Sequence, residues 1–140
     1  MPRSTTSLRL SDDVRERLTA AALAEGASLT ALIERFIVEG LAVLDHPGIV
    51  FKSGPAGRRA ALAGGPDVWE VASALRHTAG TESARVSALA AEFGIDERQV
   101  EIALRYAAAH RDEVEARIQA NDRALEEAER IAAERVRLLA

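Results

Sequence analysis

Apolar and polar residues alternate near the start of the chain, from Thr5 to Leu10. In an extended strand this alternation places Leu8 and Leu10 on one face and Thr5, Ser7 and Arg9 on the other. The pattern therefore predicts one short strand with a polar, locally basic face.

The period then changes to that of two helices. Ser11 is a suitable cap for the first, which carries two aspartates in its first turn and ends at Gly26. Ser28 is positioned to cap the second, which runs to about Leu44. The second helix has an apolar face too wide for the first helix to cover. That face comprises Leu29, Leu32, Ile33, Phe36, Ile37 and Leu41.

Prolines and glycines concentrate in residues 46–67, which marks a domain boundary. Within this segment, the short apolar runs 49–51 and 59–62 flank the sequence SGPAG and predict a small hairpin. A helix capped by Asp67 and a polar loop over 77–83 follow. Further helices are predicted over residues 84–93, 96–109 and 112 to near the end, with Gly94 breaking the first pair.

Composition favours helices over a large sheet. The 140 residues are 48% hydrophobic but include only 3 Phe, 1 Trp and 1 Tyr, whereas alanine occurs 29 times and loses least on entering a helix. There is no cysteine, which excludes a disulfide-stabilised fold. Neither a membrane span nor the apolar core of a signal peptide is evident, so we expect a cytoplasmic protein.

A single strand leaves its backbone edges unpaired, and about 44 residues are near the lower limit for independent folding. Two copies of residues 5–10 pairing antiparallel would solve both problems, and such a two-stranded ribbon fits the major groove of DNA. The starts of the two second helices would offer backbone N–H groups to phosphates. The net charge is -4, yet two arginines precede the first acid. The candidate DNA-binding residues are Arg3, Thr5, Ser7, Arg9, Ser28 and Thr30.

The sequences SLRLSDDVRERL and EGASLTALIERFI resemble the ribbon-helix-helix family of bacterial repressors and antitoxins over residues 4–44. The resemblance implies an obligate homodimer that binds a double-stranded operator with two-fold symmetry, so the protein would be nucleoid-associated when bound. Arg9 is the only charged candidate for reading bases. The simpler interpretation of residues 5–10 is an ordinary edge strand with solvated polar residues. A separate alternative is a dimeric scaffold that binds no DNA, in which the polar face of the ribbon is incidental.

A helix-turn-helix is predicted in the second half of the chain. Three residues have the spacing that this motif requires. Ala90 is the small residue at the tight contact between the helices, Gly94 is the glycine of the turn, and Val100 is the buried branched residue of the second helix. The fold does not by itself imply DNA binding. Three acids and one arginine occupy the positions that would face a groove, so we predict a role in protein interaction or dimerisation. Those positions are Asp96, Glu97, Arg98, Glu101 and Ile102.

The strings HPGIVF, GRRAAL, GPDVWEV and ALRYAA resemble a family of small bacterial domains of unassigned function, over residues 46–118. That family is similar to helix-turn-helix modules and often accompanies toxin genes for PIN-type ribonucleases, which implies a toxin partner. Arg58 and Arg59 are interpreted equally well as contacts to phosphate or an acidic partner and as solvated hairpin charges. Trp69 is predicted to lie in the core, as the largest apolar side chain of this region.

The C-terminal segment has alternating charges and sparse apolar residues, with Asn121 and Arg135 interrupting its apolar seam. Such a helix is marginal alone. It either docks into a protein partner or forms a coiled-coil-like arm on its own dimer. We therefore divide the chain into a DNA-binding and dimerisation domain (1–45), a hairpin with a helix-turn-helix-like domain (46–111) and a helical tail (112–140).

Enzyme chemistry is not expected. His46, His77 and His110 lie far apart in the sequence without ligand-spaced neighbours, and no phosphate-binding loop or nucleophile motif is present. No cofactor is implied. The prediction is a mostly α-helical antitoxin that represses its own operon and neutralises a partner toxin, or alternatively a transcriptional regulator without a toxin.

Overall fold

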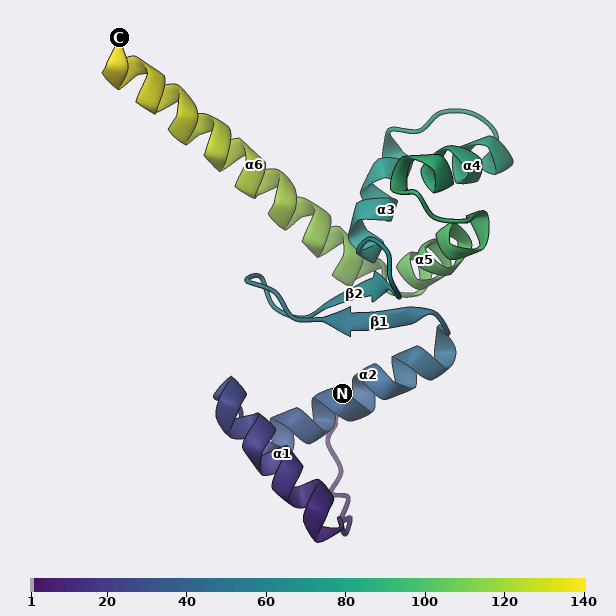
Figure 1. The fold of residues 1–140 in the computed structure, drawn as a ribbon, viewed down its shortest axis with the longest axis vertical. Coiled ribbons are helices and arrows are strands. Elements are labelled where there is room, and N and C mark those ends of the chain that lie inside the picture. The colour runs from purple at the N-terminus through teal and green to yellow at the C-terminus, as the bar shows by residue number, and fades with distance from the viewer. Residues whose placement is uncertain (1) are drawn as a thin grey trace. The chain divides into compact units, whose positions relative to one another are not determined.

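The computed structural model describes residues 2–140, which form six helices and one hairpin (Figure 1). The chain separates into two compact units, residues 2–42 and 43–140. The helices are α1 (Asp12–Glu25), α2 (Leu29–Asp45), α3 (Val68–Arg76), α4 (Glu82–Phe93), α5 (Glu97–Ala109) and α6 (Arg111–Leu139). The strands are β1 (Ile49–Lys52) and β2 (Arg59–Leu62). None of these helices combines the length and apolar character needed to cross a bilayer.

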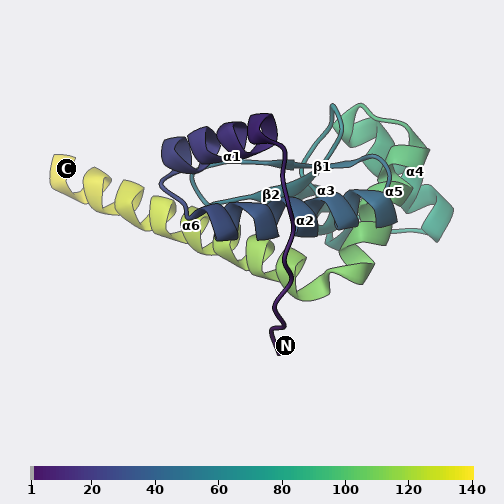
Figure 2. The ribbon, with the colours of Figure 1, turned by 90° about the horizontal axis from the view of Figure 1, so that it is seen from below.

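Residues 2–11 form neither strand nor helix, and Figure 2 shows them as an extended trace leading into α1. The strand predicted over residues 5–10 is therefore wrong for the single chain. The physical reason is that a strand needs a neighbouring edge, and no segment of the described chain supplies one.

The helices of the first unit begin and end where their capping residues predict. Ser11 Oγ accepts a hydrogen bond from the N–H of Val14 at 3.4 Å, and Gly26 ends α1 in the left-handed conformation with φ 65°. Ser28 Oγ accepts from the N–H of Ala31 at 3.1 Å at the start of α2. Both helices thus begin and end as predicted from local sequence.

The second unit contains the main hydrophobic core. Its hairpin is antiparallel, with Ile49 opposite Leu62, and one side of it packs against the helices. The buried core residues contributed by the hairpin and by α3 to α6 are Ile49, Ala60, Leu62, Val68, Val71, Val86, Leu89, Ala90, Val100, Ala103, Tyr106, Val114 and Ile118.

The predicted helix-turn-helix is present as α4, a tight turn and α5. Gly94 ends α4 with φ 64°, while Ala90 and Val100 are buried on either side of the turn. Asp96 and Gln99 form a capping box that starts α5. Helix α4 begins two residues before the predicted start, because Thr81 caps it through the N–H of Ala84.

The predicted division at residue 112 implied that α6 is a separate tail from its first turn. The structure shows otherwise. Val114 and Ile118 are buried in the core of the second unit. Arg76 of α3 also forms an ion pair with Glu115 of α6 and, by hydrogen bonding, lowers the pKa of that carboxyl. The beginning of α6 is therefore part of this unit, and every residue beyond Asn121 is exposed.

Candidate nucleic-acid interface

The six predicted DNA-binding residues all lie in the first unit, and all are exposed: Arg3, Thr5, Ser7, Arg9, Ser28 and Thr30. Arg9 forms no hydrogen bond or ion pair within the described chain. Arg3 Nη2 lies 4.0 Å from Glu34 Oε2, a weak surface pair with both side chains mostly exposed. Both guanidinium groups can therefore exchange solvent for phosphate or base atoms.

Some of the backbone N–H groups at the start of α2 are available to bind an anion. Ser28 uses its hydroxyl to cap the N–H of Ala31, and its carbonyl accepts the N–H of Leu32 at 3.0 Å. Helix geometry leaves the N–H groups of Leu29 and Thr30 without intrahelical acceptors. Ser28 is thus a helix cap in this structure, and Thr30 is the more accessible of the two predicted contacts.

The first unit buries little of its own apolar surface. Only Ala22 and Leu32 are buried among its described residues. Val14 and Leu18 of α1 and Phe36 of α2 line an open groove of about 340 Å³, and Phe36 remains 46% exposed. The apolar face of α2 is therefore uncovered in the single chain, as its width predicted. Its other exposed members include Ile37 and Leu41.

One ion pair holds the two helices together. Arg35 of α2 donates hydrogen bonds of 2.6 and 3.1 Å to the carboxylate of Glu25 at the end of α1. This carboxylate raises the pKa of Arg35 further above its ordinary value. The guanidinium also lies 5.2 Å from the ring centre of Phe36. The pair therefore links the end of α1 to α2 beside the buried Leu32.

The groove-facing positions of the helix-turn-helix carry more acidic than basic side chains. Asp96 is engaged in the capping box, and Glu97, Arg98 and Glu101 are exposed. Ile102 is partly buried and packs so closely on Gly48 that a Cβ there would lie 3.0 Å from its Cδ1. These side chains favour a structural or protein-binding role over contact with phosphate.

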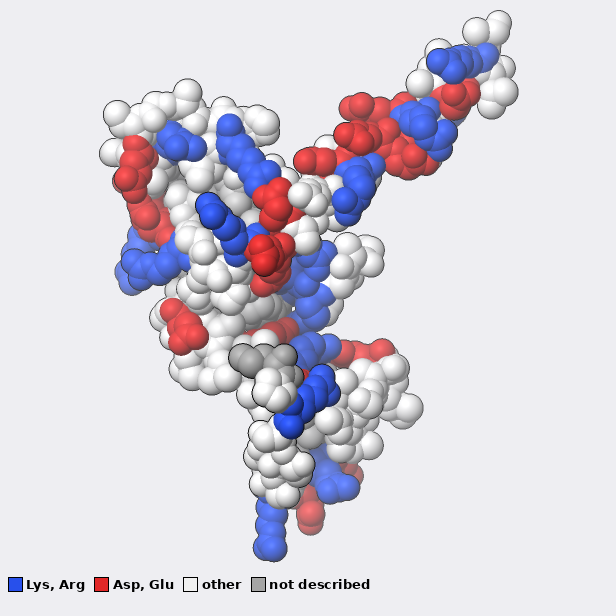
Figure 3. Space-filling model, turned by 180° about the vertical axis from the view of Figure 1, so that it is seen from behind, with Lys and Arg blue, Asp and Glu red and all other residues white. Residues whose placement is uncertain are grey.

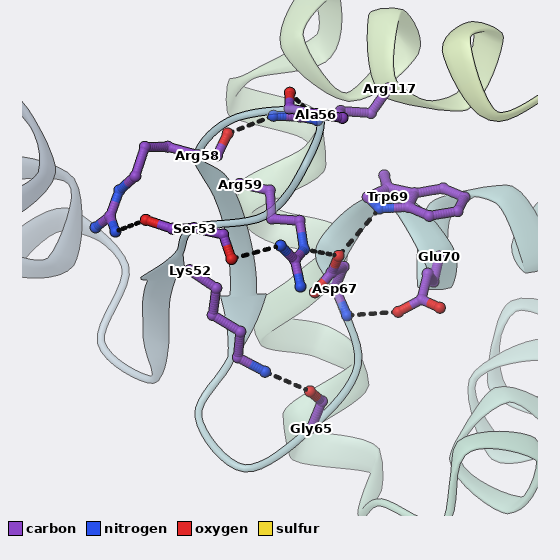
Figure 4. A network of polar contacts seen from close by, with 10 residues as sticks. All are labelled: Lys52, Ser53, Ala56, Arg58, Arg59, Gly65, Asp67, Trp69, Glu70 and Arg117. Atoms are coloured by element: carbon purple, nitrogen blue, oxygen red, sulfur yellow. Dashed lines mark hydrogen bonds and ion pairs between the residues drawn. The ribbon is translucent and has the colours of Figure 1, made fainter. Parts of the chain in front are cut away.

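The hairpin arginines belong to a polar network centred on Asp67 (Figure 4). The buried Asp67 carboxylate accepts from Arg59 Nε and from Trp69 Nε1, the latter at 3.2 Å. Arg59 also donates to the carbonyl of Ser53 at 3.2 Å, and Arg58 to the hydroxyl of the same serine at 2.9 Å. These bonds within the fold favour the structural interpretation of Arg59 over a contact to phosphate.

Helix α6 joins the same network. Arg117 donates to the backbone carbonyls of Ala56, at 2.8 Å, and of Arg58. Trp69 is only partly buried and packs against the edge of the core rather than inside it, and its indole N–H donates to Asp67. The ring instead lines a groove of about 280 Å³ beside the hairpin turn and Ala120 of α6.

We expect Asp67→Ala to destabilise the second unit by about 1–3 kcal/mol, because two donors, on Arg59 and Trp69, lose a buried acceptor. Urea denaturation followed by circular dichroism measures this change. Asp45→Ala is the matched control: Asp45 is exposed at the end of α2, so its loss should change stability by less than about 0.5 kcal/mol. Equal midpoints for the two variants would contradict a stabilising role for Asp67.

The histidines are not all isolated. The rings of His46 and His110, distant in sequence, lie 5.4 Å apart between centres, and His110 stacks on Tyr106 at 4.1 Å. The Tyr106 hydroxyl donates to the carboxylate of Glu113 at 3.1 Å. Within residues 2–140 no group of three or more potential ligands is arranged to hold a metal ion.

Comparisons of the chain with protein-family models, with curated proteins and with solved structures found no match.

Proposed function

We propose that two copies of the first unit associate into a ribbon-helix-helix dimer and that this dimer binds operator DNA as a transcription regulator. The uncovered apolar face of α2 carries the proposal. A single chain leaves Phe36, Ile37 and Leu41 about half exposed, which is costly for side chains of this size in water. A second copy of the same unit supplies a matching face.

The N-terminal segment supports the same assembly. Residues 2–10 run extended, and no strand of the described chain pairs with them. Antiparallel pairing with a second copy satisfies their backbone groups and brings Leu8, which is 53% exposed here, onto the joined helices. Thr5, Ser7 and Arg9 then form the outer face of the ribbon, where hydroxyl and guanidinium groups suit base edges.

Toxin neutralisation is the second candidate function. The groove beside Trp69 and Ala120 favours it, since exposed apolar surface in the second unit suits a protein partner. The identity of that partner as a PIN-type ribonuclease rests on the resemblance alone. Co-purification of the full chain with the product of the adjacent gene, at a fixed stoichiometry, is the result that this candidate predicts.

Salt dependence tests the DNA-binding proposal with any duplex, because the phosphate contribution does not depend on sequence. Each phosphate contact contributes about -0.9 to the slope of log K against log salt concentration. We expect Arg3→Ala, which removes one contact from each copy, to make the slope of the dimer shallower by about 2. Fluorescence anisotropy with a labelled duplex measures it.

Arg137→Ala is the matched control for this titration, since Arg137 is exposed on α6 and pairs with Glu134 at 3.0 Å. It should leave the slope unchanged. A chain that binds no duplex at low salt, or equal slopes for both variants, would contradict the assignment of Arg3.

A further inference from the structure

Beyond Asn121, every residue of α6 is exposed, and the helix extends away from the helices that pack against its first turns (Figure 1). Leu125 and Ile131 are 56% and 55% exposed, and Leu138 is 86% exposed. Figure 3 shows acidic and basic side chains along this exposed part of the helix. The distal half of α6 therefore presents large apolar side chains that the described chain does not cover.

These apolar side chains share one face. Successive side chains of a helix are rotated by about 100° around its axis, and these apolar side chains all lie within about 80° of Ala128 in that rotation. Every acidic residue from 119 to 140 lies outside this sector, and Arg135 is the only charged residue inside it. The members of the face are Ala124, Leu125, Ala128, Ile131, Ala132, Val136, Leu138 and Leu139.

The face has the period of a two-stranded coiled coil. The seam advances by alternating steps of four and three residues, which is the heptad spacing of helices that pack against each other. It starts at Val114 and Ile118, which are already buried in the second unit. The later seam positions are Asn121, Leu125, Ala128, Ala132, Arg135 and Leu139. A partner helix would thus continue a packing surface that the fold has begun.

Charge along the helix favours one orientation of that partner. Residues 119–129 carry four acids and one arginine, whereas residues 130–139 carry three arginines and one glutamate. A parallel second copy would set the acidic halves side by side and both Arg135 side chains in one layer. Arg130 and Arg137 lie on the far side of the helix and pair with Glu127 and Glu134 of the same chain, at 2.6 and 3.0 Å. The orientation therefore depends on Arg135, which an antiparallel copy places within the acidic half of the other helix.

We infer that residues 119–139 of α6 pair antiparallel with the same segment of a second copy of this chain. Heptad positions allow antiparallel registers seven residues apart, and the register that overlaps residues 119–139 most fully places Ala128 opposite Ala132 of the second copy and Asn121 opposite Leu139. The small alanines at the centre let the two helix backbones approach closely. Arg135 lies beside Leu125 of the second copy, within its acidic half. The inference is independent of the proposed DNA-binding function, because it concerns a different unit.

Thiol cross-linking of the full chain tests the orientation, since the protein contains no cysteine of its own. Asn121→Cys and Leu139→Cys are made separately, and each is treated with a short bis-maleimide alone and after mixing. The antiparallel register predicts cross-linked dimers in the mixture and few in either variant alone. Cross-linking of each variant with itself would establish a parallel pair and overturn the inference. Absence of cross-links in all three samples, across a concentration series, would also overturn it and leave the face to another protein.

A matched pair of substitutions tests the face. Ala132 lies in the seam and Ala133 on the polar side, and both are exposed in the single chain. Ala132→Glu, added to the mixed cysteine variants, should reduce the cross-linked yield by at least about tenfold, because it buries a charge at the centre of the pair. Ala133→Glu should leave the yield unchanged. Equal yields would overturn the inference, and circular dichroism of both variants establishes that the fold is intact.

Discussion

Phe36→Ala is expected to abolish both dimer formation and DNA binding. Phe36 lies on the uncovered face of α2 and is 46% exposed in the single chain, so its burial depends on the second copy. Truncation of a buried aromatic side chain costs about 3–5 kcal/mol, and the proposed core exists only in the dimer. Sedimentation equilibrium should show a large rise in the dissociation constant, or an unfolded first unit.

The control for this experiment is Leu23→Ala in α1. Leu23 is 83% exposed and points away from the apolar face, so its truncation should leave association unchanged. Because the inferred α6 contact could hold copies together, both variants are also made with Ala132→Glu. If Phe36→Ala remained a stable dimer with full affinity for DNA in that background, Phe36 would lie outside the dimer core and the proposed assembly would be wrong.

Arg9→Ala is expected to leave the dimer folded and to remove its preference for the operator. Arg9 is exposed and makes no hydrogen bond or ion pair within the described chain, so its loss has no structural cost. A lost bidentate contact to guanine costs about 1–3 kcal/mol in each half-site. Loss of this contact in both half-sites should therefore lower the affinity for the operator by at least about 30-fold. Anisotropy titrations with operator and scrambled duplexes measure the difference.

Arg9→Lys separates charge from geometry in the same assay. Lysine keeps the positive charge but lacks the planar fork that contacts guanine bidentately. It should retain affinity for the scrambled duplex while losing most of the discrimination. Undiminished discrimination in Arg9→Ala would remove Arg9 from the set of base-reading residues.

Local sequence predicted most of the helices because their signals lie within a few residues. Ser11 and Gly26 delimit α1 by capping geometry alone, and Gly94 gives the turn between α4 and α5. The hairpin also formed where the apolar runs were predicted, although alanine is a weak strand former. Packing of Ala60 and Leu62 into the core compensates for that weakness.

Contacts between distant segments could not be predicted in this way. Nothing in the local sequence shows that Asp67 is the shared acceptor of Arg59 and Trp69, or that Arg117 reaches the hairpin turn. The proximity of His46 and His110 likewise depends on the packing of the whole second unit. The strand predicted over residues 5–10 did not form for a different reason, since no segment of the described chain offers it an edge to pair with. Of the candidate interface, the sequence predicted both the exposed positions and the use of Ser28 as the cap of α2.

The most direct test of the central claim is a selection of duplexes from a random-sequence library by the full-length protein. It is run in parallel with Arg9→Ala and with Arg98→Ala, the only arginine among the groove-facing positions of the helix-turn-helix. A ribbon-helix-helix dimer predicts an enriched motif with two-fold symmetry that survives Arg98→Ala and is lost in Arg9→Ala. No enrichment by the wild-type protein, or a motif lost in Arg98→Ala and kept in Arg9→Ala, would contradict the proposed function.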